Sequence, residues 1–180
     1  VSLIAARDRR GRIACYPLSA NVHEDGILAE TRAPFRHAQL QRAAERHHRR
    51  LMQALGYAGV LCIEYFVERG RLVANEMAPR VHNSGHWTIE GAETSQFENH
   101  VRAIAGLPLG STRPRGFAVM VNLIGRMPDR KTLLGMPGVH LHDYDKSPRP
   151  GRKLGHLTAV AATARQRDRA ALRLLRFSRR

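Results

Sequence analysis

The chain has 180 residues, 43% of them apolar and 25% charged, which is the composition of one ordinary globular domain with or without a small appendage. Its two cysteines, Cys15 and Cys62, lie in apolar runs without CxxC spacing. They exclude a disulfide framework and favour a reducing compartment such as the cytoplasm. The apolar runs are too short for a membrane span, so we expect no membrane partner.

The formal net charge is +15, and all but three of the 30 basic residues are arginines. These arginines are spread along the whole chain, which is more typical of a coding bias than of a nucleic-acid-binding stripe. We therefore expect no nucleic-acid partner. A basic nucleic-acid-binding module remains the alternative from a different functional class.

The first predicted elements are two strands, at 1–6 and 12–16, that form a hairpin around RDRRGR. The chain lacks an initial methionine and starts inside strand-like sequence, so we expect it to be a fragment. A helix is predicted over 36–55 and ends at Gly56. Its apolar stripe consists of Leu40, Ala44, His48, Leu51 and Leu55, with His48 interpreted as a core residue.

The middle of the chain predicts a second hairpin followed by a second helix. GVLCIEYFVERGRLVANEMAP reads as two apolar strands joined at ERGR. In TSQFENHVRAIAGLPLG, Ser95 and Glu98 have the spacing of a capping box. Phe97, Val101 and Ile104 line one face of that helix.

The sequence beyond residue 110 predicts a small lobe rich in strands. We expect strands at 117–124, 138–144 and 154–162, and a closing helix near 168–177. The predicted fold class is α+β, with one unit at 1–110 and a smaller unit at 111–180.

Two glutamates of the second hairpin, Glu64 and Glu76, form the first candidate site. A three-residue loop at Arg69-Gly70-Arg71 would place them directly opposite each other on one face, whereas a two-residue loop would send them to opposite faces. Two carboxylates about 5 Å apart would repel each other, and a bound magnesium ion would compensate. Alternatively, they are two unrelated glutamates.

A polar cluster follows Glu76 where the backbone leaves the strand: NEMAPRVHNSGHWTI. Arg80, His82 and Asn83 are side chains that hold an oxyanion or phosphate. Alternatively, this is a polar loop that tucks Trp87 into the core, and we interpret Trp87 itself as a packing residue.

A basic loop in the small lobe, DYDKSPRPGRKLGH, is a further candidate. Lys146, Arg152 and Lys153 surround prolines that stiffen the loop, which favours phosphate binding. A merely solvated basic turn explains the same composition.

Three passages, CIEYF…NEMAPRVHNSGHWTIEGAETSQFENHVRAIAGLPLG, AVMVNLIG and KSPRPGRKLGH, closely resemble the 5-(carboxyamino)imidazole ribonucleotide synthases of purine biosynthesis, which are ATP-grasp ligases. The resemblance runs from Val1 to about Thr163. It implies the second lobe of an ATP-grasp domain, an antiparallel sheet with helices, followed by a small strand-rich C-terminal domain. Another ATP-grasp ligase of purine synthesis is the alternative within this class.

The resemblance implies an activity and a set of ligands. Bicarbonate attacks the γ-phosphate of ATP to give carboxyphosphate, which carboxylates 5-aminoimidazole ribonucleotide. Mg²⁺ is the expected metal, with Mn²⁺ as an alternative.

The same resemblance implies roles for the candidate residues. Glu64 and Glu76 would hold the metal, and Asn75 would join them in binding the ATP. Arg80, His82 and Asn83 would receive bicarbonate and the imidazole, and Lys146, Arg152 and Lys153 would clamp the substrate phosphate.

Family members are about twice as long as this chain and are commonly homodimers. The 180 residues therefore resemble the carboxy-terminal half of such an enzyme. Alone they should bind ATP weakly and turn over nothing measurable, because the substrate sites of this family lie between lobes.

Overall fold

The structure is a computed structural model, and it describes residues 1–178. In chain order the elements are β1 (Ser2–Arg7), β2 (Ile13–Cys15), β3 (Ala20–Glu24), β4 (Ile27–Ala33), α1 (Ala38–Ala54), β5 (Gly59–Glu68), β6 (Arg71–Ala78), the 3-10 turn η1 (Asn83–Gly85), α2 (Thr88–Gly91), α3 (Gln96–Ile104), β7 (Phe117–Ile124), α4 (Arg130–Leu134), β8 (Val139–Asp143), β9 (Lys153–Ala161) and α5 (Ala164–Ser178).

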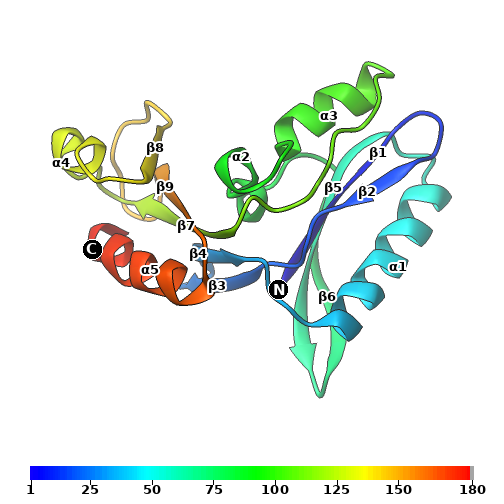
Figure 1. The fold of residues 1–180 in the computed structure, drawn as a ribbon, viewed down its shortest axis with the longest axis horizontal. Coiled ribbons are helices and arrows are strands. Elements are labelled where there is room, and N and C mark those ends of the chain that lie inside the picture. The colour runs from blue at the N-terminus through cyan, green and yellow to red at the C-terminus, as the bar shows by residue number, and fades with distance from the viewer. Residues whose placement is uncertain (179–180) are drawn as a thin grey trace.

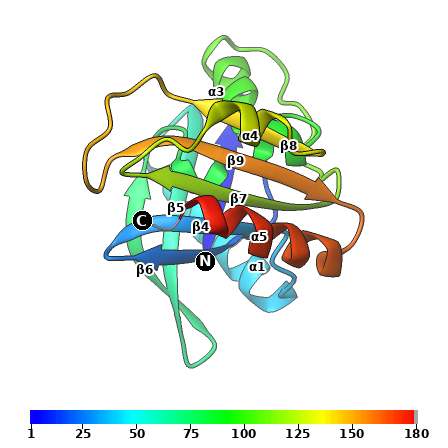
Figure 2. The same ribbon diagram turned by 90° about the vertical axis from the view of Figure 1, so that its left-hand side faces the viewer.

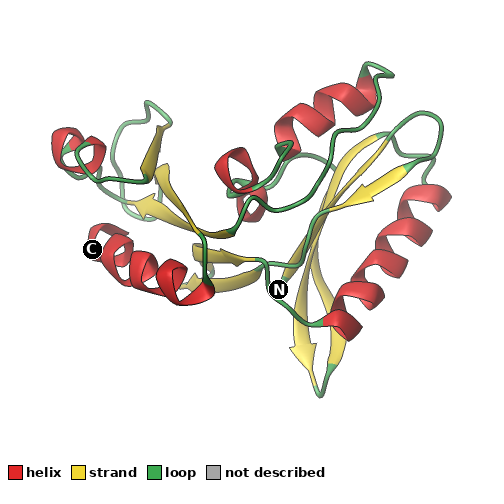
Figure 3. Cartoon of the chain, viewed as in Figure 1, coloured by secondary structure: helices red, strands yellow, loops and turns green. Residues whose placement is uncertain are grey.

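The strands form two antiparallel sheets, with the orders β2-β1-β5-β6 and β3-β4-β7-β9-β8. Helix α1 runs along one side of the first sheet and α3 lies on its other side. Helix α2 lies between α3 and the second sheet, on which α5 also packs (Figure 1). The view turned by 90° shows the strands of the second sheet lying across those of the first (Figure 2). Antiparallel sheets flanked by helices (Figure 3) confirm the predicted α+β fold class.

Alternation along β1 and β5 divides the core between the two faces of the first sheet. Leu3 and Leu61 pack under α1, whereas Ile4 and Cys62 join Met120 of the second sheet in the core where the sheets meet. Glu64 follows Cys62 by two positions, so its side chain emerges on the face that meets the second sheet. The core pattern thus directs a carboxylate toward the junction of the two sheets.

The turn of the β5–β6 hairpin decides between the two loop lengths considered from the sequence. Its loop contains two residues, Arg69 and Gly70, both with positive φ, and Glu68 pairs with Arg71. Two positive φ values are characteristic of the turn whose twist matches the flanking strands. Of the two loops considered from the sequence, the structure has the two-residue one, for which the sequence analysis expected Glu64 and Glu76 on opposite faces.

Helix α1 confirms the predicted stripe except at its end. Leu40, Ala44 and His48 are buried, but Met52 takes the last core position and Leu55 is exposed. The helix ends at Ala54, so Leu55 is its C-cap residue and does not continue the buried stripe.

Helix α3 begins where the sequence predicted. The Ser95 hydroxyl accepts a hydrogen bond from the Glu98 amide, which confirms the predicted N-cap. The apolar face of Phe97, Val101 and Ile104 is exposed, however. The buried face carries two amide side chains and an alanine, Gln96, Asn99 and Ala103.

The hairpin β3–β4 was not predicted. It contributes two strands to the second sheet, where β4 pairs with β7. That sheet therefore combines strands from both sides of residue 110, and the division into units at 1–110 and 111–180 stays a prediction. Within residues 1–178, no helix has the length and apolar content to cross a membrane.

Candidate active site

The two candidate carboxylates lie directly opposite each other in spite of the two-residue turn. Tyr65 pairs with Ala74, but the next pair is Glu64 with Glu76, so Asn75 is an extra residue on β6. This one-residue bulge restores the register that the shorter turn would have shifted. The turn and the bulge together bring the two acids to one face.

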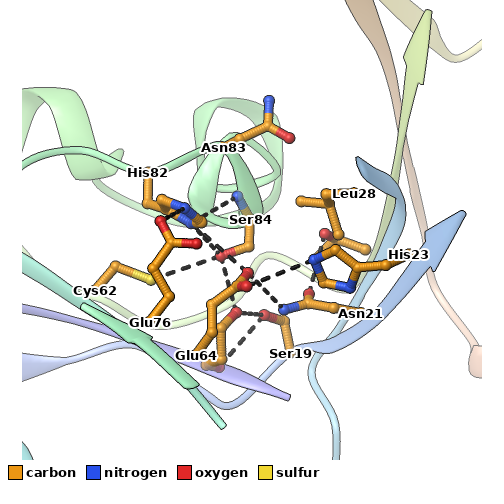
Figure 4. Close-up of polar contacts among 12 residues, drawn as sticks. Ser19, Asn21, His23, Leu28, Cys62, Glu64, Glu76, His82, Asn83 and Ser84 are labelled. Carbon is orange, nitrogen blue, oxygen red and sulfur yellow. Dashed lines mark hydrogen bonds and ion pairs between the residues drawn. The ribbon is translucent and has the colours of Figure 1, made fainter. Parts of the chain in front are cut away.

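His82 lies between the two carboxylates (Figure 4). Its Nδ1 is 3.9 Å from Glu64 Oε1, and its Nε2 is 3.7 Å from Glu76 Oε1. Burial lowers the pKa of His82, while the charges of Glu64 and Glu76 act to raise it. The Ser84 amide donates to Nδ1, which places the proton of the neutral ring on Nε2, facing Glu76.

The two carboxylates differ in exposure. Glu64 is 5% exposed, whereas the Glu76 side chain is 55% exposed. Two residues of β3 support the buried one: Asn21 Nδ2 donates to Glu64 Oε1 at 3.3 Å, and His23 Nε2 is 3.5 Å from Oε2. One acid is thus fixed by the protein and the other remains open to a ligand.

Sequence reasoning missed Asn21 and His23 because it did not predict their hairpin. A signal was present, since Asp25 and Gly26 form the Asp-Gly turn that is typical of two-residue hairpins. Both residues have positive φ in the structure. A bulge between Val22 and His23 then shifts the register beside the site, as the bulge at Asn75 does on β6.

The loop after β6 brings the predicted Arg80, His82 and Asn83 to one cavity. Arg80 is exposed, and its guanidinium donates to the Val81 carbonyl oxygen at 2.9 Å. The Asn83 carboxamide exchanges hydrogen bonds with that of buried Asn122 on β7, so it ties the loop to the second sheet. Trp87 is fully buried in the core, as predicted.

The basic loop places two of its three candidates at this cavity. Lys146 and Lys153 line it, but Arg152 does not, and the Arg152 guanidinium donates to the Ser147 carbonyl oxygen. Burial lowers the pKa of Lys153, and the charges of Glu64 and Glu76 oppose that shift. Tyr144, which was not predicted, also lines the cavity and carries the Lys146 ammonium 5.1 Å above its ring.

Two cavities meet at the carboxylate pair. One, of about 550 Å³, holds the basic and imidazole groups just described. The other, of about 340 Å³, is lined by Asn75, Tyr65 and Phe66. Glu64 and Glu76 line both cavities, so a cation between them would touch ligands in either one.

The donor set suits magnesium better than a metal held by protein ligands alone. Among residues 1–178 there is no group of three or more histidine, cysteine, aspartate or glutamate side chains placed to hold a metal ion. Magnesium characteristically takes one or two carboxylates and completes its shell with water and phosphate oxygens. Glu64 and Glu76 fit that requirement.

Comparison with known families identifies two regions of the chain. The ATP-grasp domain family matches residues 1–97, and the phosphoribosylaminoimidazole carboxylase C-terminal domain family matches residues 118–170. The chain is 52% identical over 172 residues to the N5-carboxyaminoimidazole ribonucleotide synthase of Pseudomonas aeruginosa, which covers 96% of this chain and 46% of that protein. The Escherichia coli synthase is 52% identical over 158 residues, or 87% of this chain and 44% of that protein.

Solved structures give the same result for the fold. The crystal structure of N5-carboxyaminoimidazole ribonucleotide synthetase from Thermus thermophilus superimposes with a TM-score of 0.96 at 53% identity, over 100% of this chain and 51% of that one. The Aspergillus clavatus synthase in complex with ADP and 5-aminoimidazole ribonucleotide gives 0.90 at 32% identity, over 99% and 51% of the two chains.

This chain therefore spans about half the length of the relatives it matches. The family match to more than half of its residues and the shared fold settle its classification: the chain belongs to the ATP-grasp family.

Proposed function

We propose that this chain forms part of an enzyme that carboxylates 5-aminoimidazole ribonucleotide with bicarbonate at the expense of ATP, in purine biosynthesis. The observation that carries the proposal is the carboxylate pair at the junction of two cavities, one of which is rich in basic groups. The similarity to N5-carboxyaminoimidazole ribonucleotide synthases supports the choice of reaction within the ATP-grasp family.

Glu64 and Glu76 would hold the magnesium ion that accompanies ATP, with Mn²⁺ as a substitute. When bound, the ion would neutralise phosphate charge and orient the γ-phosphoryl group for transfer. Asn21 and His23 keep Glu64 in place for this task. Asn75 lines the smaller cavity, and we assign it to the nucleotide.

The larger cavity would take the acceptor. Bicarbonate attacks the γ-phosphorus and releases ADP, which gives carboxyphosphate. The exocyclic amine of the ribonucleotide then takes the carboxyl carbon, and inorganic phosphate leaves. Arg80 supplies a fixed positive charge for the anions. The Nε2 proton of His82 and the Nδ2 proton of Asn83 that does not bond to Asn122 would orient them.

Lys146 and Lys153 would bind the ribonucleotide 5′-phosphate. Both line the larger cavity, and Lys153 is held near the carboxylates, so the phosphate would lie on the basic side of the metal site. The role proposed for Arg152 has less support, because its guanidinium is directed to the backbone of its own loop.

We further propose that the 180 residues alone bind ATP weakly and turn over nothing measurable. Positioning contributes on the order of 7–11 kcal/mol in well-oriented reactions, and this chain provides only part of the walls that a protein of twice the length would have. The expected compartment is the cytoplasm, and a homodimer is the expected assembly.

A chimaera tests the proposal. The 180 residues would replace the matching segment of the Pseudomonas aeruginosa synthase, to which they are 52% identical. Phosphate release that requires both bicarbonate and 5-aminoimidazole ribonucleotide is the expected result, and Glu76→Gln should abolish it while the thermal unfolding temperature is kept. Glu68→Gln is the matched control, because Glu68 is exposed on the same hairpin and lines neither cavity. A folded chimaera without activity, or an active Glu76→Gln variant, would overturn the proposal.

A further inference from the structure

The buried side chain of Gln96 holds the backbone of His82. Gln96 is the first residue of α3 and is fully buried. Its Oε1 accepts a hydrogen bond from the His82 amide at 3.0 Å, and its Nε2 donates to the His82 carbonyl oxygen at 2.7 Å. One carboxamide thus satisfies both backbone groups of His82, as a neighbouring strand would.

The second proton of Nε2 is also used. It faces Nδ1 of His86 at 3.0 Å, so Nδ1 of that neutral ring accepts. Both Nε2 protons are then engaged, and the carboxamide plane is fixed by two residues of one loop, His82 and His86. A side chain with only donors or only acceptors would not make this set of bonds.

The surrounding residues leave space for this carboxamide and no more. A Cβ atom on Gly85 would overlap the Gln96 amide group. Gly85 does not need positive φ, so the close approach is the reason for a glycine here. The Thr88 hydroxyl accepts a hydrogen bond from the backbone N–H of Gln96 at 2.9 Å and donates one to the Gly85 carbonyl oxygen. These two bonds attach the loop to the first turn of α3.

We propose that Gln96 is the positioning residue for His82, and that α3 fixes the site through it. The expected effect on catalysis rests on the proposed function, whereas the effect on the position of His82 does not. The backbone of His82 is held by Gln96, and its ring contacts Glu64 and Glu76. Without the Gln96 carboxamide, the backbone of His82 would lose both of these hydrogen bonds. The imidazole ring would then no longer be held between Glu64 and Glu76.

Two isosteric variants separate positioning from ordinary stability. Gln96→Met removes the hydrogen bonds to His82 and His86 at nearly constant volume. Asn99→Leu is the matched control, because Asn99 is also a fully buried amide on α3 but bonds to Tyr16 and Gly110, away from the site. Both variants should lower the thermal unfolding temperature, since each leaves buried backbone or hydroxyl groups unpaired.

The first readout is the imidazole ¹H–¹⁵N spectrum of the 180-residue chain, in which His82 is assigned with a His82→Asn variant. Gln96→Met should shift the His82 signals, and Asn99→Leu should leave them in place. Gly85→Ala should reproduce the shift from the other side of the contact. The control is Gly91→Ala, which places a Cβ atom 2.8 Å from Ala118 Cβ in the core. It should leave the His82 signals in place.

The second readout is the kinetics of the chimaera. Gln96→Met should lower kcat about 10- to 100-fold, the cost of a misplacement near 1 Å, and should change KM for ATP less than about twofold. Asn99→Leu should keep kcat. Unmoved His82 signals in both Gln96→Met and Gly85→Ala, or equal loss of kcat in Gln96→Met and Asn99→Leu, would overturn the inference. An inactive wild-type chimaera would instead count against the proposed function, because the spectra do not depend on turnover.

Discussion

The stability of the chain should fall as the pH is lowered, because His48 is buried as a neutral imidazole. His48 is fully buried in α1, and its Nδ1 is 2.9 Å from the Ala44 carbonyl oxygen, to which it donates. Burial lowers the pKa of His48 to about 4, and interactions with the backbone of Ala44 and Leu3 act in the opposite direction.

The sign and the size follow from linkage. The unfolded chain takes up a proton at His48 below its ordinary pKa of about 6.5, whereas the folded chain does so only near pH 4. The stability due to the neutral ring is therefore complete above about pH 6.5 and is lost as the pH falls toward 4. Between about pH 7.5 and pH 5 the loss is about 2 kcal/mol, a large part of the stability of an ordinary domain.

Urea unfolding followed by circular dichroism at several pH values in that range measures the effect. His48→Gln keeps a donor for the Ala44 carbonyl oxygen but does not titrate, so its free energy of unfolding should fall by about 2 kcal/mol less than that of the wild type over this range. His47→Gln, on the exposed side of the same helix, should follow the wild type. Equal pH dependence in His48→Gln and the wild type would refute the reasoning.

Three further substitutions test the packing. Trp87→Ala should lower the free energy of unfolding by about 3–5 kcal/mol in urea titrations, because the ring is fully buried where the two sheets meet; a loss under about 1 kcal/mol would contradict that placement. Val101→Ser, on the exposed face of α3, should change stability by no more than about 0.5 kcal/mol, whereas Ala103→Leu on the buried face should cost about 1–3 kcal/mol; the reverse order would show that the helix faces the other way. Gly70→Ala should cost about 1–2 kcal/mol in thermal unfolding, because Gly70 has a φ of +76°, and an unchanged unfolding temperature would argue against the two-residue turn.

The pairing of Glu64 with Glu76 was predicted for a reason that proved incomplete. Counting residues around a three-residue loop gave the right partners, but the chain reaches them with a two-residue loop and a bulge. A turn and a bulge each shift the register by one, and their effects cancel. The sequence shows the glycine that a tight turn needs, but Asn75 carries no comparable mark of a bulge.

The face of α3 illustrates a second limit. Phe97, Val101 and Ile104 are the large apolar residues of this helix, and periodicity favours them as a packing face. The buried face instead carries Gln96 and Asn99, whose amides satisfy backbone groups of neighbouring loops. Such partners lie outside the helix, so its own pattern cannot reveal them.

The sequence predicted the residues that line the site better than it predicted the residues that hold them in place. Polar residues after an apolar strand indicated Arg80, His82 and Asn83, and these reach one cavity with Lys146 and Lys153. Asn21, His23 and Tyr144 come from other segments of the chain. Their place at the site depends on how the two sheets meet, which no local pattern specifies.

The most direct test of the metal site is a crystal of the chimaera grown with Mn²⁺ and ADP, with diffraction measured at the manganese absorption edge. The account predicts an anomalous peak at the junction of the two cavities, within coordination distance of a carboxylate oxygen from both Glu64 and Glu76. A manganese ion bound to the nucleotide but to neither glutamate, or to only one of them, would contradict it.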